Sequence, residues 1–316
     1  MDKYTCVLHA EMTSFLNYYK SMGRDVRGYV TIFNKLDSLL RDLNIAEKTI
    51  TNSVAEQFWN SFSVRPYCFY NYISHYNVFA RYLNRLGFPA CEFDLPKLQS
   101  DYTPYIFTNE EWNRIIEAAD NFLIPRCPLY SIQVPLLIRI LYGCGTRISE
   151  TLSLRVGDVD LISGVLYLKN TKNKRHRIVP MDSSLTDIFR QYIRVRGLKS
   201  EDFVFHAQRK YDHWNIHSVG NCFEHILRDA NISFVREQPF DRGPCIHCLR
   251  HTFVLNSLRK SEEEGRNFSE TVPFLSTYLG HASIRETDKY LRFCYELYDE
   301  AVDMVDAYTA NLFPEV

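Results

Sequence analysis

The stretch VPLLIRILYGCGTRISETLSL, residues 134–154, predicts a buried helix, a glycine turn and a second helix. Its first half is mostly apolar, which is typical of a helix inside a core. The glycines then break the run, and Arg147 begins the next helix. A guanidinium at that position can hold two oxygens of one phosphate, helped by the N–H groups of the helix. For the arginine alone, a surface ion pair with Glu150 is the simpler alternative.

Beyond residue 157 the pattern changes to short runs whose composition favours β-strands. GVLYLKN and HRIVPM flank a polar turn, so we expect an antiparallel hairpin over 165–181. Helical periodicity describes most of the remaining chain. The predicted fold is therefore mainly α with a small antiparallel β-sheet.

The chain is expected to contain two domains. Residues 1–97 carry apolar stripes at helical spacing, and residues 98–105 lie in a segment with two prolines and no period, which indicates a linker. A second domain then covers 106–316. Two pairs have the spacing of a capping box and should begin helices; they are Ser53 with Glu56, and Thr108 with Glu111.

The composition predicts an ordinary globular protein without a membrane segment. Of 316 residues, 46% are hydrophobic and 24% charged, and the formal net charge is −1. No apolar run approaches the roughly 18 residues of a transmembrane helix, and the N-terminus lacks the pattern of a signal peptide. Nine cysteines, an odd number spread along the chain, do not indicate a disulfide framework. We therefore expect a cytoplasmic protein.

A basic run, TKNKRHR at 171–177, covers the tip of the predicted hairpin. Such runs are commonly solvated turns, but they bind phosphates when they form part of a basic face. Lys172 sits at the turn, where a lysine with a lowered pKa could give its proton to a leaving oxygen. In the first domain, Arg81 and Arg85 lie one helical turn apart, where they could reach the same phosphate strand or serve surface solubility alone. The residues that we expect to contact DNA are Lys174, Arg175, Arg177, Arg81 and Arg85.

The segment PCIHCLRHTF, residues 244–253, has two interpretations. Cys245 and Cys248 could supply two zinc ligands, but no second pair follows at a suitable distance, so we expect no metal. His247 and Arg250 are instead three residues apart on one face of an expected helix. From that face both could reach a single phosphate.

A tyrosine completes the set of residues suited to a phosphodiester. In LGHASIRETDKYLRF, His281 lies in a turn and Tyr290 in the helix that follows. Because a free tyrosine has a pKa of about 10, it attacks phosphorus only when positive charge is nearby. The arginines, the lysine and the histidines would supply that charge. Together they predict phosphoryl transfer by a tyrosine nucleophile without a metal.

Four segments of the chain resemble the motif blocks of the tyrosine recombinases, the family of phage integrases and Xer proteins. They occur in the family's order; they are GCGTRISETLSLRVGDVDL, TKNKRHRIVP, HCLRHTF and LSTYLGHASIRETDKYL. The resemblance implies that Arg147 and Arg250 clamp the scissile phosphate. It also implies that Tyr290 forms a 3′-phosphotyrosyl link to the cleaved strand.

The same resemblance implies roles for the other polar residues. His247 would transfer a proton near the attacking hydroxyl, and His281 would hydrogen-bond the phosphate. Lys172 would protonate the departing 5′ oxygen, while Glu150 would orient the neighbouring Arg147. In this family the covalent link stores the energy of the phosphodiester, so neither ATP nor a metal is implied and no cofactor is expected.

The resemblance further implies partners and an overall arrangement. The first domain is similar in size and position to the family's core-binding domain, which forms a C-shaped clamp on double-stranded DNA core sites together with the catalytic domain. An amphipathic stripe from Tyr298 to Leu312 would be a helix that packs on its own domain, or on a neighbouring protomer in a tetramer or a paired recombinase. The chain departs from the compact Xer-like members by a longer segment between Arg250 and His281, and the acidic stretch Glu262–Glu264 in it should form a loop that faces away from DNA or meets a partner.

Site-specific DNA recombination is therefore the predicted function, with integration, excision or transposition of a bacterial mobile element as the expected role. Xer-type dimer resolution and DNA inversion are alternatives within the same chemistry. A type IB topoisomerase would share the tyrosine chemistry but relax DNA without joining two sites. A non-enzymatic DNA-binding protein that kept the fold is the remaining alternative.

Overall fold

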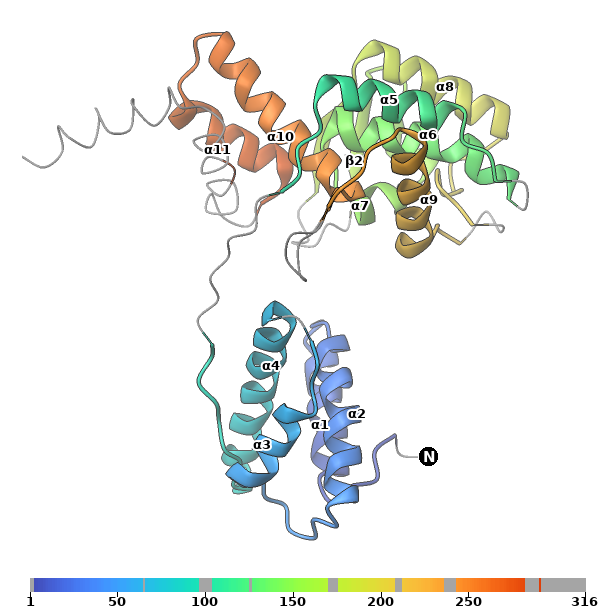
Figure 1. The fold of residues 1–316 in the computed structure, drawn as a ribbon. Coiled ribbons are helices and arrows are strands. Elements are labelled where there is room, and N and C mark those ends of the chain that lie inside the picture. The colour runs from blue at the N-terminus through green and yellow to red at the C-terminus, as the bar shows by residue number, and fades with distance from the viewer. Residues whose placement is uncertain are drawn as a thin grey trace, which may run out of the picture. The chain divides into compact units, whose positions relative to one another are not determined.

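The computed structural model describes residues 3–64, 66–96, 104–124, 127–169, 176–207, 212–235, 243–281 and 290. The chain divides into two compact units, Met1–Asp101 and Tyr102–Val316 (Figure 1). The division falls inside the segment 98–105 that the sequence indicates as a linker. All of the predicted catalytic residues belong to the second unit.

The first unit consists of helices around an aromatic core. Its described helices are α1 (His9–Ser21), α2 (Arg27–Asp42), α3 (Asn52–Asn60) and α4 (Pro66–Arg85). Helix α2 packs against the other three. The rings of Phe15, Phe33 and Phe79 meet between α1, α2 and α4, with centroids 4.4–5.8 Å apart. Aromatic burial therefore supplies much of the free energy that holds this unit together.

The start of α3 differs from the prediction. The side chain of Thr51, rather than that of Ser53, caps the helix by accepting from the Val54 N–H group over 3.4 Å. Ser53 lies inside the first turn, because the chain leaves its extended conformation two residues earlier. The capping box of Thr108 and Glu111 at the start of α5 (Asn109–Asp120) is confirmed.

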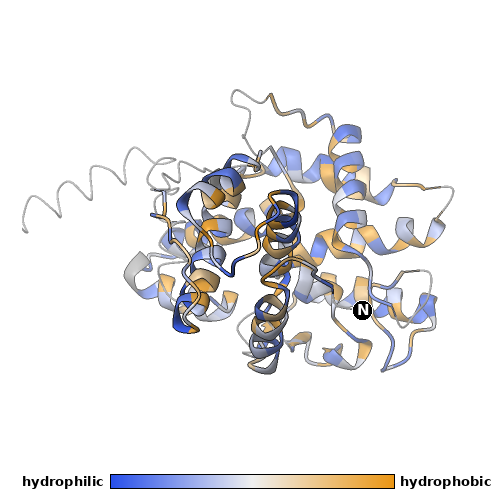
Figure 2. Ribbon diagram, turned by 90° about the horizontal axis from the view of Figure 1, so that it is seen from below, coloured by the Kyte–Doolittle hydropathy of each residue, from blue (hydrophilic) through white to orange (hydrophobic). Residues whose placement is uncertain are grey.

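The second unit is built around α6, the buried helix that the 134–154 stretch predicts. Its described helices are α5 (Asn109–Asp120), α6 (Pro128–Cys144), α7 (Ile148–Leu152), η1 (Val156–Asp158, a 3₁₀ helix), α8 (Ser183–Arg196), α9 (Ile216–Asp229), α10 (Ile246–Glu263) and α11 (Phe268–Leu279). Helix α6 contacts α5, α7, α8 and α10, and α11 packs against α10. Figure 2 shows that hydrophobic and hydrophilic residues both occur along the helices of the molecule. Among the described helices none is both long and apolar enough to cross a membrane.

A small sheet lies beside these helices. Its strands are β1 (Val159–Asp160), β2 (Val165–Leu168) and β3 (Arg177–Pro180), in the order β1-β2-β3 and antiparallel throughout. Leu166 pairs with Val179, and both side chains enter the core. The predicted hairpin is therefore confirmed, as is the mainly helical fold class, and β1 adds a short third strand. The hairpin tip at 170–175 lies outside the described residues.

The predicted glycine turn between α6 and α7 is also confirmed. Gly145 ends α6 in the left-handed conformation, with φ at 58°. A Cβ atom there would lie 2.2 Å from the ring of Phe253 in α10, so only glycine fits without moving that helix. The tight turn brings the start of α7 close to α10, and with it Arg147.

The acidic stretch expected to be a loop is helical instead. Helix α10 continues to Glu263, and Glu264 is its C-terminal cap residue. Glu262–Glu264 are all exposed, and Glu264 pairs with Arg266 over 3.0 Å. Three consecutive glutamates have good helix propensity, which outweighs their mutual repulsion on a solvated face.

Candidate active site

Arg250 lies at the centre of the candidate active site, near the start of α10. Its guanidinium is buried and donates to two backbone carbonyls, from Nη1 to Gly145 O over 2.6 Å and from Nη2 to Leu279 O over 3.0 Å. These carbonyls belong to the glycine turn and to the end of α11. Burial, together with the positive charge of Arg147, lowers the pKa of Arg250 to about 10. The side chain therefore remains a cation at neutral pH.

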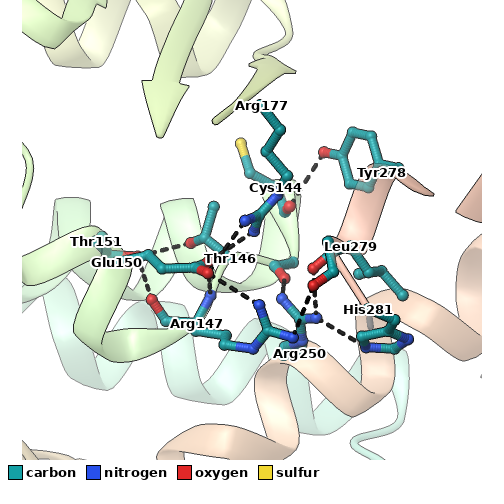
Figure 3. A network of polar contacts seen from close by, with 12 residues as sticks. Cys144, Thr146, Arg147, Glu150, Thr151, Arg177, Arg250, Tyr278, Leu279 and His281 are labelled. Carbon is teal, nitrogen blue, oxygen red and sulfur yellow. Dashed lines mark hydrogen bonds and ion pairs between the residues drawn. The ribbon is translucent and has the colours of Figure 1, made fainter. Parts of the chain in front are cut away.

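Glu150, in α7, holds two further arginines (Figure 3). Arg147 donates from Nη1 to Oε1 over 2.9 Å, and its backbone N–H group donates to Oε2 over 3.1 Å. Arg177 donates from Nη1 and Nη2 to the two oxygens over 3.0 Å and 2.6 Å. Burial alone would raise the pKa of Glu150, but the hydrogen bonds and charges of the two arginines lower it overall. Glu150 is therefore a carboxylate at neutral pH.

Arg177, which was expected to contact DNA, lies beside Glu150. Its side chain is 9% exposed, and it comes from β3 just after the hairpin tip. Both terminal nitrogens of its guanidinium are bonded to the Glu150 carboxylate in the free protein, and its contact with DNA stays a prediction. A Cβ atom at Gly280 would lie 2.9 Å from Nη1 of Arg177, so the glycine leaves room for this arrangement. Arg177 thus fixes Glu150, which in turn fixes Arg147.

We predict that Glu150→Gln lowers stability in a pH-dependent manner. Because the folded pKa of Glu150 lies below its ordinary 4.5, the carboxylate contributes its full stability above that pH. The contribution is lost as the pH falls through the lowered folded value. At pH 7 the variant should lose about 2 kcal/mol of unfolding free energy, the scale of a hydrogen bond to a charged group.

Urea unfolding from pH 7 to pH 2 measures this difference, which should shrink towards zero at the acid end. Asp187→Asn is the matched control, since Asp187 pairs with Arg190 on the exposed face of α8 and should contribute little. A difference between wild type and Glu150→Gln that stays constant over the whole range would contradict the ionised carboxylate.

His281 joins this cluster from the turn after α11. Its Nε2 atom lies 3.1 Å from Nη2 of Arg250, and the side chain is buried. Arg147 reaches the same turn by donating from Nη2 to Gly280 O over 3.2 Å. Burial, and then the charges of Arg250 and Arg147, lower the pKa of His281 to about 4. A neutral imidazole therefore lies beside Arg250 at pH 7.

Tyr290 and His251 form the second part of the site. The Tyr290 side chain is buried in a hydrophobic cluster with residues of α10 and α11. Its hydroxyl lies 2.8 Å from Nδ1 of His251. Burial, and then the charges of His247 and Arg250, lower the pKa of His251 to about 3. The neutral ring can therefore accept the phenol proton at Nδ1, in the tautomer that is protonated at Nε2.

The partner of the tyrosine hydroxyl thus differs from the one expected. His247 was expected near the attacking hydroxyl, but the structure places His251 against it, one turn further along α10. The two imidazole rings are neighbours, with centroids 4.7 Å apart. His247 as a whole residue is exposed. Its ring nevertheless has protein atoms around it, and this partial desolvation, together with the charges of Arg250 and Arg147, lowers the pKa of the imidazole. The four-residue spacing of the two histidines was visible in the sequence and would have indicated a shared helix face.

The remaining predicted residues lie elsewhere. Arg81 and Arg85 are exposed on α4 in the first unit, where Arg81 pairs with Glu92 over 2.8 Å. The amphipathic stripe from Tyr298 to Leu312 lies outside the described residues. So do the predicted residues of the hairpin tip, which are Lys172, Lys174 and Arg175.

Among the described residues, the two cysteines at the start of α10 have no larger cluster of metal ligands around them. Cys245 and Cys248 have their sulfurs 3.6 Å apart at the start of α10. Within the part of the chain that the structure describes, no group of three or more His, Cys, Asp or Glu side chains could hold a metal ion. The zinc interpretation therefore gains no further ligand here.

Comparison with known proteins identifies the family. The model of the phage integrase family matches residues 106–296, more than half of the chain. The chain belongs to the phage integrase family. It is thus a tyrosine recombinase, an enzyme of site-specific DNA recombination, and the resemblance of the four motif segments is confirmed.

Relatives of this tyrosine recombinase cover most of its length. A putative integrase/recombinase, y4rB, from Sinorhizobium fredii is 29% identical over 243 residues, which are 73% of this chain and 75% of that protein. A tyrosine recombinase from Thermosipho africanus is 25% identical over 279 residues, covering 87% and 88% of the two chains. Both similarities extend well beyond the motif segments.

Solved structures share the fold. A lambda integrase fragment, crystallised as a dimer bound to a COC′ core site, superposes with a TM-score of 0.63 at 14% identity, over 90% of this chain and 94% of that one. The XerH site-specific recombinase, in a post-cleavage complex with palindromic difH substrate, has a TM-score of 0.61 at 17% identity, over 89% and 80%. At such identities the likeness concerns the fold.

Proposed function

We propose that this recombinase cleaves and rejoins DNA at Tyr290, through a covalent 3′-phosphotyrosyl intermediate. The observation that carries the proposal is the contact between the Tyr290 hydroxyl and Nδ1 of His251 over 2.8 Å, beside the cluster around Arg250. A tyrosine becomes a nucleophile when a neighbouring group takes its proton and fixed cations stabilise the charge that develops. His251 is suited to the first task and the arginines to the second.

In the proposed site, Arg147 and Arg250 bind the scissile phosphate. Their positive charges lie close enough for Arg147 to lower the pKa of Arg250, so an anion between them relieves their repulsion. His281, 3.1 Å from Arg250, would hydrogen-bond the same phosphate. Glu150 orients Arg147 and leaves it in a fixed geometry before DNA arrives, which reduces the reorganisation needed in the transition state.

The proposed reaction is an in-line displacement at phosphorus. Tyr290 Oη forms a bond to phosphorus as the bond to the 5′ oxygen breaks, and His251 takes the phenol proton. Lys172, which lies outside the described residues, would give a proton to the departing 5′ oxygen. Attack by the 5′ hydroxyl of another strand reverses these steps and releases the tyrosine, so no net hydrolysis occurs and no ATP is needed.

The proposed substrate is double-stranded DNA with paired core sites. The lambda integrase and XerH structures that share this fold are described as bound to a core site and to difH. We propose a tetramer of this chain, or a pairing with a second recombinase, in the cytoplasm, acting in integration or excision of a mobile element. The side chains proposed to contact the DNA backbone are Lys174, Arg175, Arg81 and Arg85.

Incubation with a nicked suicide substrate tests the proposal. Cleavage next to the nick releases a short oligonucleotide, so the protein stays attached and migrates as a covalent adduct in a denaturing gel. A second assay with two intact sites on separate DNA molecules should yield recombinant joints. A type IB topoisomerase relaxes DNA and does not produce such joints. DNA binding without any adduct would overturn the proposed chemistry.

A further inference from the structure

Two cysteines flank His247 at the start of α10, and the chemistry proposed above uses neither. Cys245 is the N-cap residue of this 18-residue helix and is exposed. Cys248 lies three residues later and is fully buried. Their sulfurs are 3.6 Å apart, and the N–H group of Cys245 donates to the sulfur of Cys248 over 3.3 Å. An accessible thiol and a buried thiol thus face each other across a single helical turn.

This arrangement has the features of a thiol–disulfide exchange pair. The N–H groups at a helix N-terminus favour the thiolate of a cysteine placed there, and the thiolate is the reactive form. A hydrogen bond between the two thiols, together with burial, raises the pKa of Cys248. Cys245 is therefore the sulfur that meets an external disulfide first, and Cys248 is the sulfur that completes the exchange.

We propose that Cys245 and Cys248 form a thiol–disulfide exchange site for small-molecule disulfides, and that its oxidation displaces His247 and slows DNA cleavage. The Cys245 thiolate attacks one sulfur of a disulfide RS–SR, forming a mixed disulfide and releasing RS⁻. The Cys248 thiolate then attacks the Cys245 sulfur and releases the second RS⁻. The two cysteines lose two electrons and two protons, and one RS–SR becomes two RSH.

Closure of the bond must move the exposed end of the helix. A disulfide bond is about 2 Å long, so the two sulfurs have to approach by about 1.5 Å. Cys248 is anchored, because its carbonyl accepts from Thr252 Oγ1 over 2.9 Å and Thr252 accepts from the Phe107 N–H group over 3.0 Å. The displacement therefore falls on Cys245 and on the turn that carries His247.

This displacement reaches the tyrosine through the histidine pair. The His247 ring lies 4.7 Å from the ring of His251, whose Nδ1 contacts the Tyr290 hydroxyl. A shift of the first turn by an ångström or so changes this packing, and misplacement on that scale costs about 100-fold in rate in other active sites. The effect on cleavage rests on the function proposed above, whereas the exchange itself does not.

The exchange is tested by treating the full-length protein with oxidised glutathione and digesting it with trypsin. Cleavage after Arg242 and Arg250 gives the peptide 243–250, which contains both cysteines and no others. This peptide should lose two hydrogens and resist thiol alkylation, and dithiothreitol should reverse both changes. A peptide that stays reduced, or that carries only glutathione, would overturn the exchange site.

The coupling is tested by two measurements on the same samples. Oxidation should slow adduct formation with the suicide substrate by at least about tenfold, reversibly, in wild type and in the control Cys127→Ser. It should have no such effect in Cys245→Ser, which should match reduced wild type. NMR signals of the His247 ring should shift on oxidation of wild type without DNA.

An unchanged His247 signal, or full cleavage activity in the disulfide form, would overturn the coupling. If reduced wild type forms no adduct at all, the proposed function fails, and the peptide mass and the His247 signal still decide this inference.

Discussion

Tyr290→Phe is expected to abolish the covalent protein–DNA adduct while leaving DNA binding in place. The substitution removes only the hydroxyl oxygen, which is the atom proposed to bond to phosphorus. The ring remains able to fill its place in the hydrophobic cluster of α10 and α11, so the fold of the catalytic unit should be kept. Adduct yield on the suicide substrate and binding of the intact site, measured in parallel, separate the two effects.

Tyr278→Phe is the matched control for this experiment. The Tyr278 hydroxyl donates to Cys144 O over 3.0 Å, and the ring stacks on Phe253 near the same cluster. Its loss removes one hydrogen bond, worth about 1 kcal/mol, and should leave the adduct intact. An adduct that persists in Tyr290→Phe would show that another residue is the nucleophile.

The features of the fold that the sequence predicted are those set by short-range patterns. A continuous apolar helix followed by glycines requires a buried helix and a sharp turn, and the structure has both between α6 and α7. The hairpin followed from two short β-rich runs that flank a polar turn. The wrong cap at Ser53 shows the limit of such patterns. Thr51 and Ser53 are both competent caps, and packing of α3 on its unit decides where the helix starts.

The site was predictable where a motif places residues on one helix, and less so where the fold joins distant segments. Arg177 and Glu150 are 27 positions apart, and nothing in the basic run distinguishes an arginine that pairs with a buried carboxylate from one that faces solvent. His251 and Tyr290 are 39 positions apart. Only the packing of α10 against the residue at 290 selects His251 over His247.

His251→Ala is expected to slow adduct formation by about 10²–10⁴-fold, the range over which a positioned general base acts. The substitution leaves the Tyr290 hydroxyl without its acceptor at Nδ1. Because the pKa of His251 is about 3 in the free protein, the wild-type ring is neutral from pH 5 to pH 8. A fall in the second-order cleavage rate at low DNA concentration, which reports the free enzyme, should therefore not come from His251 within that range.

The test compares single-turnover cleavage rates of His251→Ala and His247→Ala. The control is His225→Ala, on the exposed face of α9. A substrate with sulfur in place of the bridging 5′ oxygen sharpens it, because a thiolate leaves without needing a proton. The defect of His251→Ala should persist on that substrate, since the tyrosine must still lose its proton. Added imidazole should restore part of the rate by occupying the vacated space.

If His251→Ala cleaves the sulfur substrate at the full rate, His251 acts on the leaving group instead. If His251→Ala cleaves normally and His247→Ala is inactive, His247 is the residue that takes the tyrosine proton. The geometry favours His251 as the base that takes the proton of Tyr290, for a further reason. When the scissile phosphate binds at the arginines, its negative charge offsets that of Arg250, which disfavours a protonated His251. Substrate binding therefore raises the proton affinity of His251 at the moment when Tyr290 must give up its proton.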